Sequence, residues 1–131
     1  MRTTIAAIAL AAALLSGAAR ADGPLGIWKT EVKDNGRFLH VEIAPCADGG
    51  AALCGTAVGA FGGAKDTTVG KRIFWDMAPD GTNEWSGGKV WAADEDKTYS
   101  GKIELTGTGL EISGCVMGGL ICRGQDWTRV N

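Results

Sequence analysis

The stretch "KTYSGKIELTGTGLEISGCV", from Lys97 to Val116, alternates apolar and polar residues on both sides of a short turn. The apolar positions of its two halves are Tyr99, Ile103, Leu105, Leu110, Ile112 and Val116. A period of two residues is that of a β-strand with one buried face. Because Thr106-Gly107-Thr108 supplies a turn between the halves, the stretch predicts an antiparallel hairpin with one dry and one wet face.

Similar runs, separated by glycine-rich or charged turns, recur along the chain after residue 22, and no sustained 3.6-residue apolar period interrupts them. We predict one domain, residues 22–131, that is all-β. The connection Gly62–Gly70 is the longest and is the candidate for a lid or an irregular segment. The eight predicted strands are Gly26–Val32, Arg37–Ala44, Leu53–Phe61, Lys71–Met77, Glu84–Ala92, Lys97–Leu105, Gly109–Val116 and Ile121–Val130.

The two ends of the chain suggest how this meander avoids exposed edges. An open sheet leaves two unpaired edge strands, whereas an up-and-down barrel removes them. The first strand begins Gly26-Ile27-Trp28, and the last strand ends with Arg129. If these strands pair, the guanidinium of Arg129 covers the indole of Trp28 and seals one end by a cation–π contact. We therefore predict a single eight-stranded antiparallel up-and-down β-barrel.

This arrangement resembles the lipocalin and wider calycin pattern, in which a G-x-W near the start accompanies a basic residue on the final strand. The segments "GIWKT", "VEIAPC", "LCG", "EWSGGKVW", "DKTYSGKIEL", "LEISGCV" and "QDWTRV" follow one another in order. Together they resemble the small exported bacterial family called domain of unknown function 2147, over about residues 25–130. A Pro and a Gly are usual in that family where this chain has "AADED". The resemblance implies a lipocalin-like barrel without an agreed biochemical activity.

The N-terminus has the features of a secretory signal peptide. Arg2 is followed by the apolar run Ile5–Leu15 and by the A-x-A site Ala19-Arg20-Ala21. We predict cleavage after residue 21 and a protein that is periplasmic or secreted. No later apolar run approaches the roughly 18 residues of a transmembrane helix, so we expect no membrane span after cleavage.

Export decides how the four cysteines are interpreted, because an oxidising compartment favours disulfides over free thiols. The spacings C-x7-C and C-x6-C differ from the C-x2-C of zinc sites, and the chain has one histidine. If Met117 to Leu120 form the last turn, Cys115 faces Cys122 at disulfide distance. Cys46 and Cys54 likewise flank a single loop. We predict disulfides within each pair, each stabilising a hairpin by about 2 kcal/mol.

Several functional classes have little support in the sequence. The net charge of −2 and the lack of a basic cluster argue against nucleic acid. The run Asp94-Glu95-Asp96 lacks EF-hand spacing, and consecutive strand residues point apart, so a solvated turn is expected there. His40 shares the predicted outer face with Glu42, and no nucleophile-elbow sequence accompanies it. We expect no cofactor and no metal, and a protein that is not an enzyme, with a hydrolase as the residual alternative.

The aromatic residues are more informative, since five Trp and one Tyr either fill the barrel or line a cavity. On the last strand, parity places Arg123 and Gln125 on the inner face with Trp127. An inward guanidinium needs a partner, which is a polar or anionic ligand head group, a protein carboxylate, or solvent reached through a bulge at Gly124.

The leading hypothesis is a non-catalytic binder of a small, partly apolar or amphipathic molecule. The alternative is an interaction module for an envelope protein, such as an inhibitor or assembly factor. The candidate ligand residues are Trp75, Tyr99, Ile112, Arg123, Gln125 and Trp127.

Overall fold

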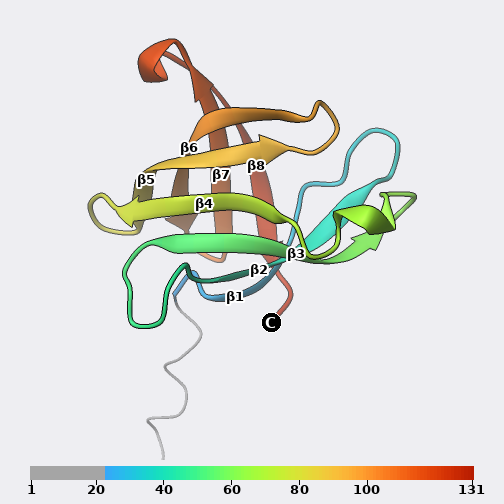
Figure 1. The fold of residues 1–131 in the computed structure, drawn as a ribbon, viewed down its shortest axis with the longest axis horizontal. Coiled ribbons are helices and arrows are strands. Elements are labelled where there is room, and N and C mark those ends of the chain that lie inside the picture. Colours follow the sequence, from blue (N-terminus) through green and yellow to red (C-terminus); the bar gives the residue numbers. More distant parts are fainter. Residues whose placement is uncertain (1–22) are drawn as a thin grey trace, which may run out of the picture.

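The computed structural model describes residues 23–131, so the predicted signal peptide lies outside the described part. Eight antiparallel strands follow one another around a closed barrel, and the first strand pairs with the last (Figure 1). The strands are β1 (Gly26–Lys29), β2 (Phe38–Pro45), β3 (Leu53–Phe61), β4 (Arg72–Pro79), β5 (Glu84–Ala92), β6 (Lys97–Thr106), β7 (Gly109–Val116) and β8 (Ile121–Arg129). The predicted all-β, up-and-down barrel is confirmed. Within residues 23–131, no helix has the length and apolar character needed to cross a membrane.

The β6–β7 hairpin has the alternation expected from its sequence. Ile103 lies opposite Ile112 on the inner face, and Lys102 lies opposite Ser113 on the outer face. Ile103 and Ile112 are almost completely buried. The inward side chains of this hairpin join those of the other strands in one continuous core, although register shifts interrupt the alternation in the β2–β3, β3–β4 and β5–β6 pairs.

The barrel closes where β1 meets β8. Trp28 lies opposite Arg129 in the register, and the guanidinium carbon of Arg129 is 4.4 Å from the centre of the Trp28 ring. The same guanidinium donates hydrogen bonds to the carbonyl oxygens of Gly23 and Leu25. The indole N–H of Trp28 donates to the carbonyl oxygen of Pro24 at 2.9 Å. The residues that precede β1 therefore seal this end, and Trp28 is fully buried.

Strand β1 is shorter than the sequence predicts. It ends at Lys29, whereas alternation extended it to Val32. The reason is the side chain of Thr30, whose hydroxyl oxygen accepts the backbone N–H of Leu39 at 2.9 Å. That contact replaces one ladder hydrogen bond, while the N–H of Thr30 still donates to the carbonyl oxygen of Leu39 at 3.0 Å. The residues up to Arg37 therefore form an exposed loop at one end of the barrel.

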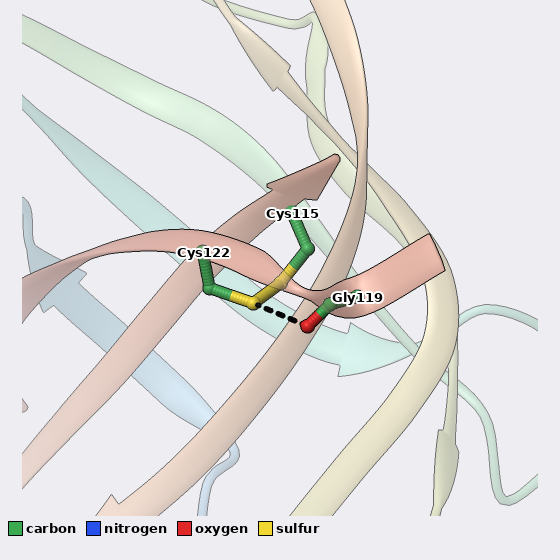
Figure 2. The surroundings of a disulfide bond; sticks show 3 residues. All are labelled: Cys115, Gly119 and Cys122. Carbon is green, nitrogen blue, oxygen red and sulfur yellow. Dashed lines mark hydrogen bonds between the residues drawn. A yellow bond between two sulfur atoms is a disulfide. The ribbon is translucent and has the colours of Figure 1, made fainter. Parts of the chain in front are cut away.

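Two disulfides join the cysteines in the expected pairs. Cys46–Cys54 links the ends of the β2–β3 hairpin, with 4.9 Å between Cα atoms. Cys115–Cys122 links directly opposed residues of β7 and β8, with 4.0 Å between Cα atoms (Figure 2). Figure 2 also shows the sulfur of Cys122 near the carbonyl oxygen of Gly119, at 3.6 Å. The sulfurs of the first pair lie within 4.8 Å of an Asp76 carboxylate oxygen, but they are bonded to each other and offer no thiolate to a metal.

The two ends of the barrel are built differently. In an up-and-down barrel alternate connections lie at the same end, so the β2–β3, β4–β5 and β6–β7 turns share one end with the termini. The core there is dense, and Trp28, Val41, Phe74 and Met77 have no exposed surface. The opposite end carries the four other connections, including the short 3-10 turn η2 (Asp66–Thr68) and the turn η3 (Met117–Gly119).

Candidate ligand-binding site

A cavity of about 780 Å³ opens at the end with four connections. Its lining comes from the β1–β2 loop, the segment before and including η2, the β5–β6 turn and the β7–β8 hairpin. The volume lies within the range of about 300–1,000 Å³ that is usual for small-molecule sites. Apolar side chains from different strands form its wall, and they are Leu39, Ile73, Val90, Ile112 and Trp127. The cavity thus combines a wall continuous with the core and an opening to solvent.

Five of the six candidate ligand residues lie along this cavity, and they are Tyr99, Ile112, Arg123, Gln125 and Trp127. Trp75 does not line it. This tryptophan lies opposite Lys89 on β4, half-buried. Its neighbour Asp76 has a φ of +57°, a left-handed backbone that is rare outside glycine and that interrupts the alternation of the strand. Phe74 and Met77, three residues apart, are therefore both buried in the core, and simple parity misplaces the tryptophan between them.

Strand β8 supplies the polar part of the wall. Arg123, Gln125 and Trp127 alternate along it, opposite Gly114, Ile112 and Leu110 of β7. The indole N–H of Trp127 donates a 2.7 Å hydrogen bond to the side-chain oxygen of Gln125. This contact orients the amide so that its NH₂ group remains available to a ligand. Arg123 and Gln125 therefore form a polar rim nearer the cavity opening, and Trp127 belongs to the apolar floor below them.

A salt bridge crosses the opening of the cavity. Lys33, in the β1–β2 loop, lies 3.0 Å from Asp94 in the β5–β6 turn. In a closed barrel of eight strands, β1 and β5 lie on opposite sides, so this pair spans the mouth. The hydrogen bond from Lys33 lowers the pKa of Asp94 below its ordinary value of 3.8. Because both side chains are about half exposed, the pair adds little stability and its effect is on the shape of the mouth.

The acidic turn next to this salt bridge does not form a converging cluster. Asp94 binds Lys33, whereas Glu95 accepts a 2.6 Å hydrogen bond from the hydroxyl of Tyr99. Asp96 accepts one of 2.9 Å from the indole N–H of Trp91. Each of the three carboxylates thus has its own hydrogen-bond partner, as expected of a solvated turn.

The hydrogen bond from Tyr99 to Glu95 raises the pKa of the phenol above its ordinary value of 10.0. The positive charge of Arg123 acts in the opposite direction and lowers it. The pKa of Tyr99 therefore depends on both the acidic β5–β6 turn and Arg123 of β8. Tyr99 lines the cavity, as do both Glu95 and Arg123.

The histidine lies away from the cavity. His40 is on the outer face, half-buried, and its ring centre is 4.5 Å from that of Phe61 and 6.1 Å from that of Phe38. Phe38 in turn stacks on Phe61 at 5.1 Å, with the amine of Lys29 4.7 Å from the Phe38 ring. These contacts give His40 a packing role on the barrel wall.

Sequence patterns missed most of the lining residues, and among the loop contributors they missed Lys33, Arg37, Lys65 and the β5–β6 turn. Strand alternation predicts which residues face inward, but loops have no period that would place their side chains. The run Asp94-Glu95-Asp96 was the one available signal, since a charged turn beside a barrel end is well placed to contact charges of other loops.

Comparison with known proteins agrees with this architecture. The model of a family described as "Uncharacterized protein conserved in bacteria (DUF2147)" matches residues 26–129. The fold is similar to that of HP1028 from the human pathogen Helicobacter pylori, a solved protein described as belonging to the lipocalin family. The TM-score is 0.66, with 16% identity and 82% of each chain covered, so the likeness establishes the fold. Among curated proteins, none matches this chain.

Proposed function

The chain belongs to the bacterial DUF2147 family, and from the geometry of its barrel we propose that it is a non-catalytic, extracytoplasmic protein that binds a small, partly apolar ligand. The observation that carries this proposal is the cavity of about 780 Å³ at the open end. Its floor is apolar and its rim polar, which is the composition of sites that bury the body of a ligand and orient its head. The two disulfides fit an oxidising compartment outside the cytoplasm.

Binding of a neutral apolar dye tests the proposal. N-phenylnaphthylamine fluoresces strongly in apolar surroundings, and we expect saturable binding at one site per chain. Val90 lines the cavity, and Val90→Trp should fill part of it and weaken dye binding at least about tenfold. Val58→Trp adds the same bulk at a position that is 42% exposed and outside the cavity lining, so it should bind as the unchanged protein does.

Urea unfolding of both variants checks that they fold. Equal dye binding by the two variants would place the dye elsewhere and would remove the support for a cavity site. No saturable binding by the unchanged protein would count against the proposal as a whole.

An interaction module for an envelope protein is the second candidate, favoured by the tip of the β7–β8 hairpin. Leu120 is 83% exposed and Met117 is 69% exposed, which is unusual for large apolar side chains. Native mass spectrometry of protein isolated from its own host separates the two functions. A small-molecule adduct supports the ligand proposal. A bound polypeptide that is lost in the Met117→Ser, Leu120→Ser variant supports the interaction module.

A further inference from the structure

We propose that the barrel mouth selects amphiphiles with an anionic head group, which Arg123 and the Gln125 amide bind, while the apolar chain lies along the wall below. This inference rests on the proposed function and names the chemical class of ligand for the same cavity. A carboxylate or a phosphate monoester on a single aliphatic chain has the required chemistry.

The first argument is the charge of the cavity lining. The chain as a whole carries a net charge of −2, yet the lining holds more cations than anions. The cationic lining residues are Lys33, Arg37, Lys65 and Arg123, and the anionic ones are Glu31, Asp94 and Glu95. A positive mouth on an acidic protein attracts anions selectively.

The second argument is which of these charges already have partners. All three carboxylates are engaged, since Glu31 accepts the backbone N–H of Asp126, Asp94 binds Lys33 and Glu95 accepts the Tyr99 hydroxyl. Within residues 23–131 the one ion pair is Lys33–Asp94. Arg123 therefore presents its guanidinium to the cavity without a carboxylate from the described part of the chain.

The third argument is the space in front of Arg123. The residue opposite it in the register is Gly114, which has no side chain to compete for the guanidinium. A Cβ at this glycine would lie 3.2 Å from the Cβ of Tyr99, tighter than most such contacts, and 3.4 Å from a Val90 methyl, at the edge of ordinary contact. Glycine at this position therefore leaves room for the Tyr99 and Val90 side chains and adds no side chain of its own beside Arg123.

The fourth argument is the order of groups down the wall of β8. Arg123 is exposed at the rim, Gln125 is half-buried below it, and Trp127 is 2% exposed at the floor. The Gln125 amide has its oxygen occupied by Trp127, so what it offers upward is a donor. Two donors above an apolar floor match a head group that only accepts hydrogen bonds, followed by an aliphatic chain.

Displacement of N-phenylnaphthylamine by amphiphiles of equal chain length tests this inference. The competitors are decanoate and decyltrimethylammonium, each used below its micelle concentration, and decanol, used below its solubility limit. Decanoate should displace the dye at a concentration at least about tenfold lower than decanol, and the cation should be the weakest. Arg123→Gln should weaken decanoate by about 10- to 100-fold and leave decanol within about twofold.

Two variants control for charge and geometry. Lys102→Gln removes one positive charge from the outer face of β6, away from the cavity lining, and should change nothing. Arg123→Lys keeps the charge but loses the two-pronged contact, and it should recover only part of the affinity. Arg123 is exposed, so these variants should fold, and urea unfolding verifies it.

The possible outcomes distinguish the preference for an anionic head group from the existence of the cavity site itself. Equal displacement by the three competitors, or an Arg123→Gln effect that is the same for decanoate and decanol, overturns the anionic head group while the cavity site stands. Failure of the unchanged protein to bind the dye at all overturns the cavity site itself.

Discussion

The two disulfide-linked hairpins lie at opposite ends of the barrel and enclose opposite kinds of residue. The β2–β3 loop, closed by Cys46–Cys54, contains the small and polar segment Ala47–Ala52 and adjoins the packed end. The β7–β8 loop, closed by Cys115–Cys122, contains the apolar segment Val116–Ile121 and stands clear of the barrel at the top of Figure 1. Val116 and Ile121 also line the cavity. A disulfide of similar loop length thus lies beside the packed core at one end of the barrel and beside the cavity opening at the other.

The packed end should hold most of the stability. Trp28→Ala removes a side chain with no exposed surface and should lower the free energy of unfolding by about 3–5 kcal/mol. Trp91→Ala removes a half-buried indole at the mouth and should cost no more than about 2 kcal/mol. Urea unfolding of the oxidised proteins, followed by circular dichroism, gives both values. Equal losses would show that the mouth is as tightly packed as the sealed end.

The two disulfides should contribute similarly to stability but differently to binding. Their sequence separations are 8 and 7 residues, so the loop-entropy effect of each is about 2 kcal/mol. Cys115→Ala, Cys122→Ala should in addition weaken dye binding several-fold, because it releases the hairpin that forms part of the cavity wall. Cys46→Ala, Cys54→Ala serves as the matched control. Equal weakening of dye binding by the two double variants would contradict the proposed difference between the two ends of the barrel.

The smallest expected effect concerns the titration of the one tyrosine. The Glu95 hydrogen bond raises the pKa of Tyr99 above 10.0, so this contact stabilises the fold below pH 10.0 and is lost as the pH rises through the higher folded-state pKa. Ultraviolet absorbance should show the pKa falling toward 10.0 in Glu95→Gln and rising further in Arg123→Gln. Glu104→Gln, exposed on the outer face of β6, should leave it unchanged. An unchanged titration in both mouth variants would mean that the two charges do not meet at Tyr99.

The sequence predicts the parts of the structure that depend on neighbouring residues. The register of the last hairpin follows from its turn and its alternation, and Cys115–Cys122, Ile112–Gln125 and Leu110–Trp127 are opposed as expected. Barrel closure also follows, because residues at the two ends complement each other. These features need only the period of a strand, the chemistry of a turn and the cost of an open edge.

The remaining features depend on irregular backbone. Trp75 leaves the inner face because Asp76 adopts a positive φ, and a non-glycine residue at a bulge gives no warning in the sequence. The Lys33–Asp94 pair joins residues 61 positions apart, and it forms only because two aperiodic loops converge over the mouth. Both features follow from the path of the chain in space, and no periodic pattern in the sequence predicts either of them.

The narrow seam between β1 and β8 has a consequence for the design of variants. Only two register pairs join these strands, yet the N–H of Ile27 is 3.3 Å from the carbonyl oxygen of Asn131. The start and finish of the described chain are therefore neighbours in space. A short peptide could join them, and new termini could be opened in the β4–β5 turn while every strand keeps its neighbours. Such a circular permutant would place both new ends at the sealed base, leaving the mouth free for attachment to a surface or a reporter.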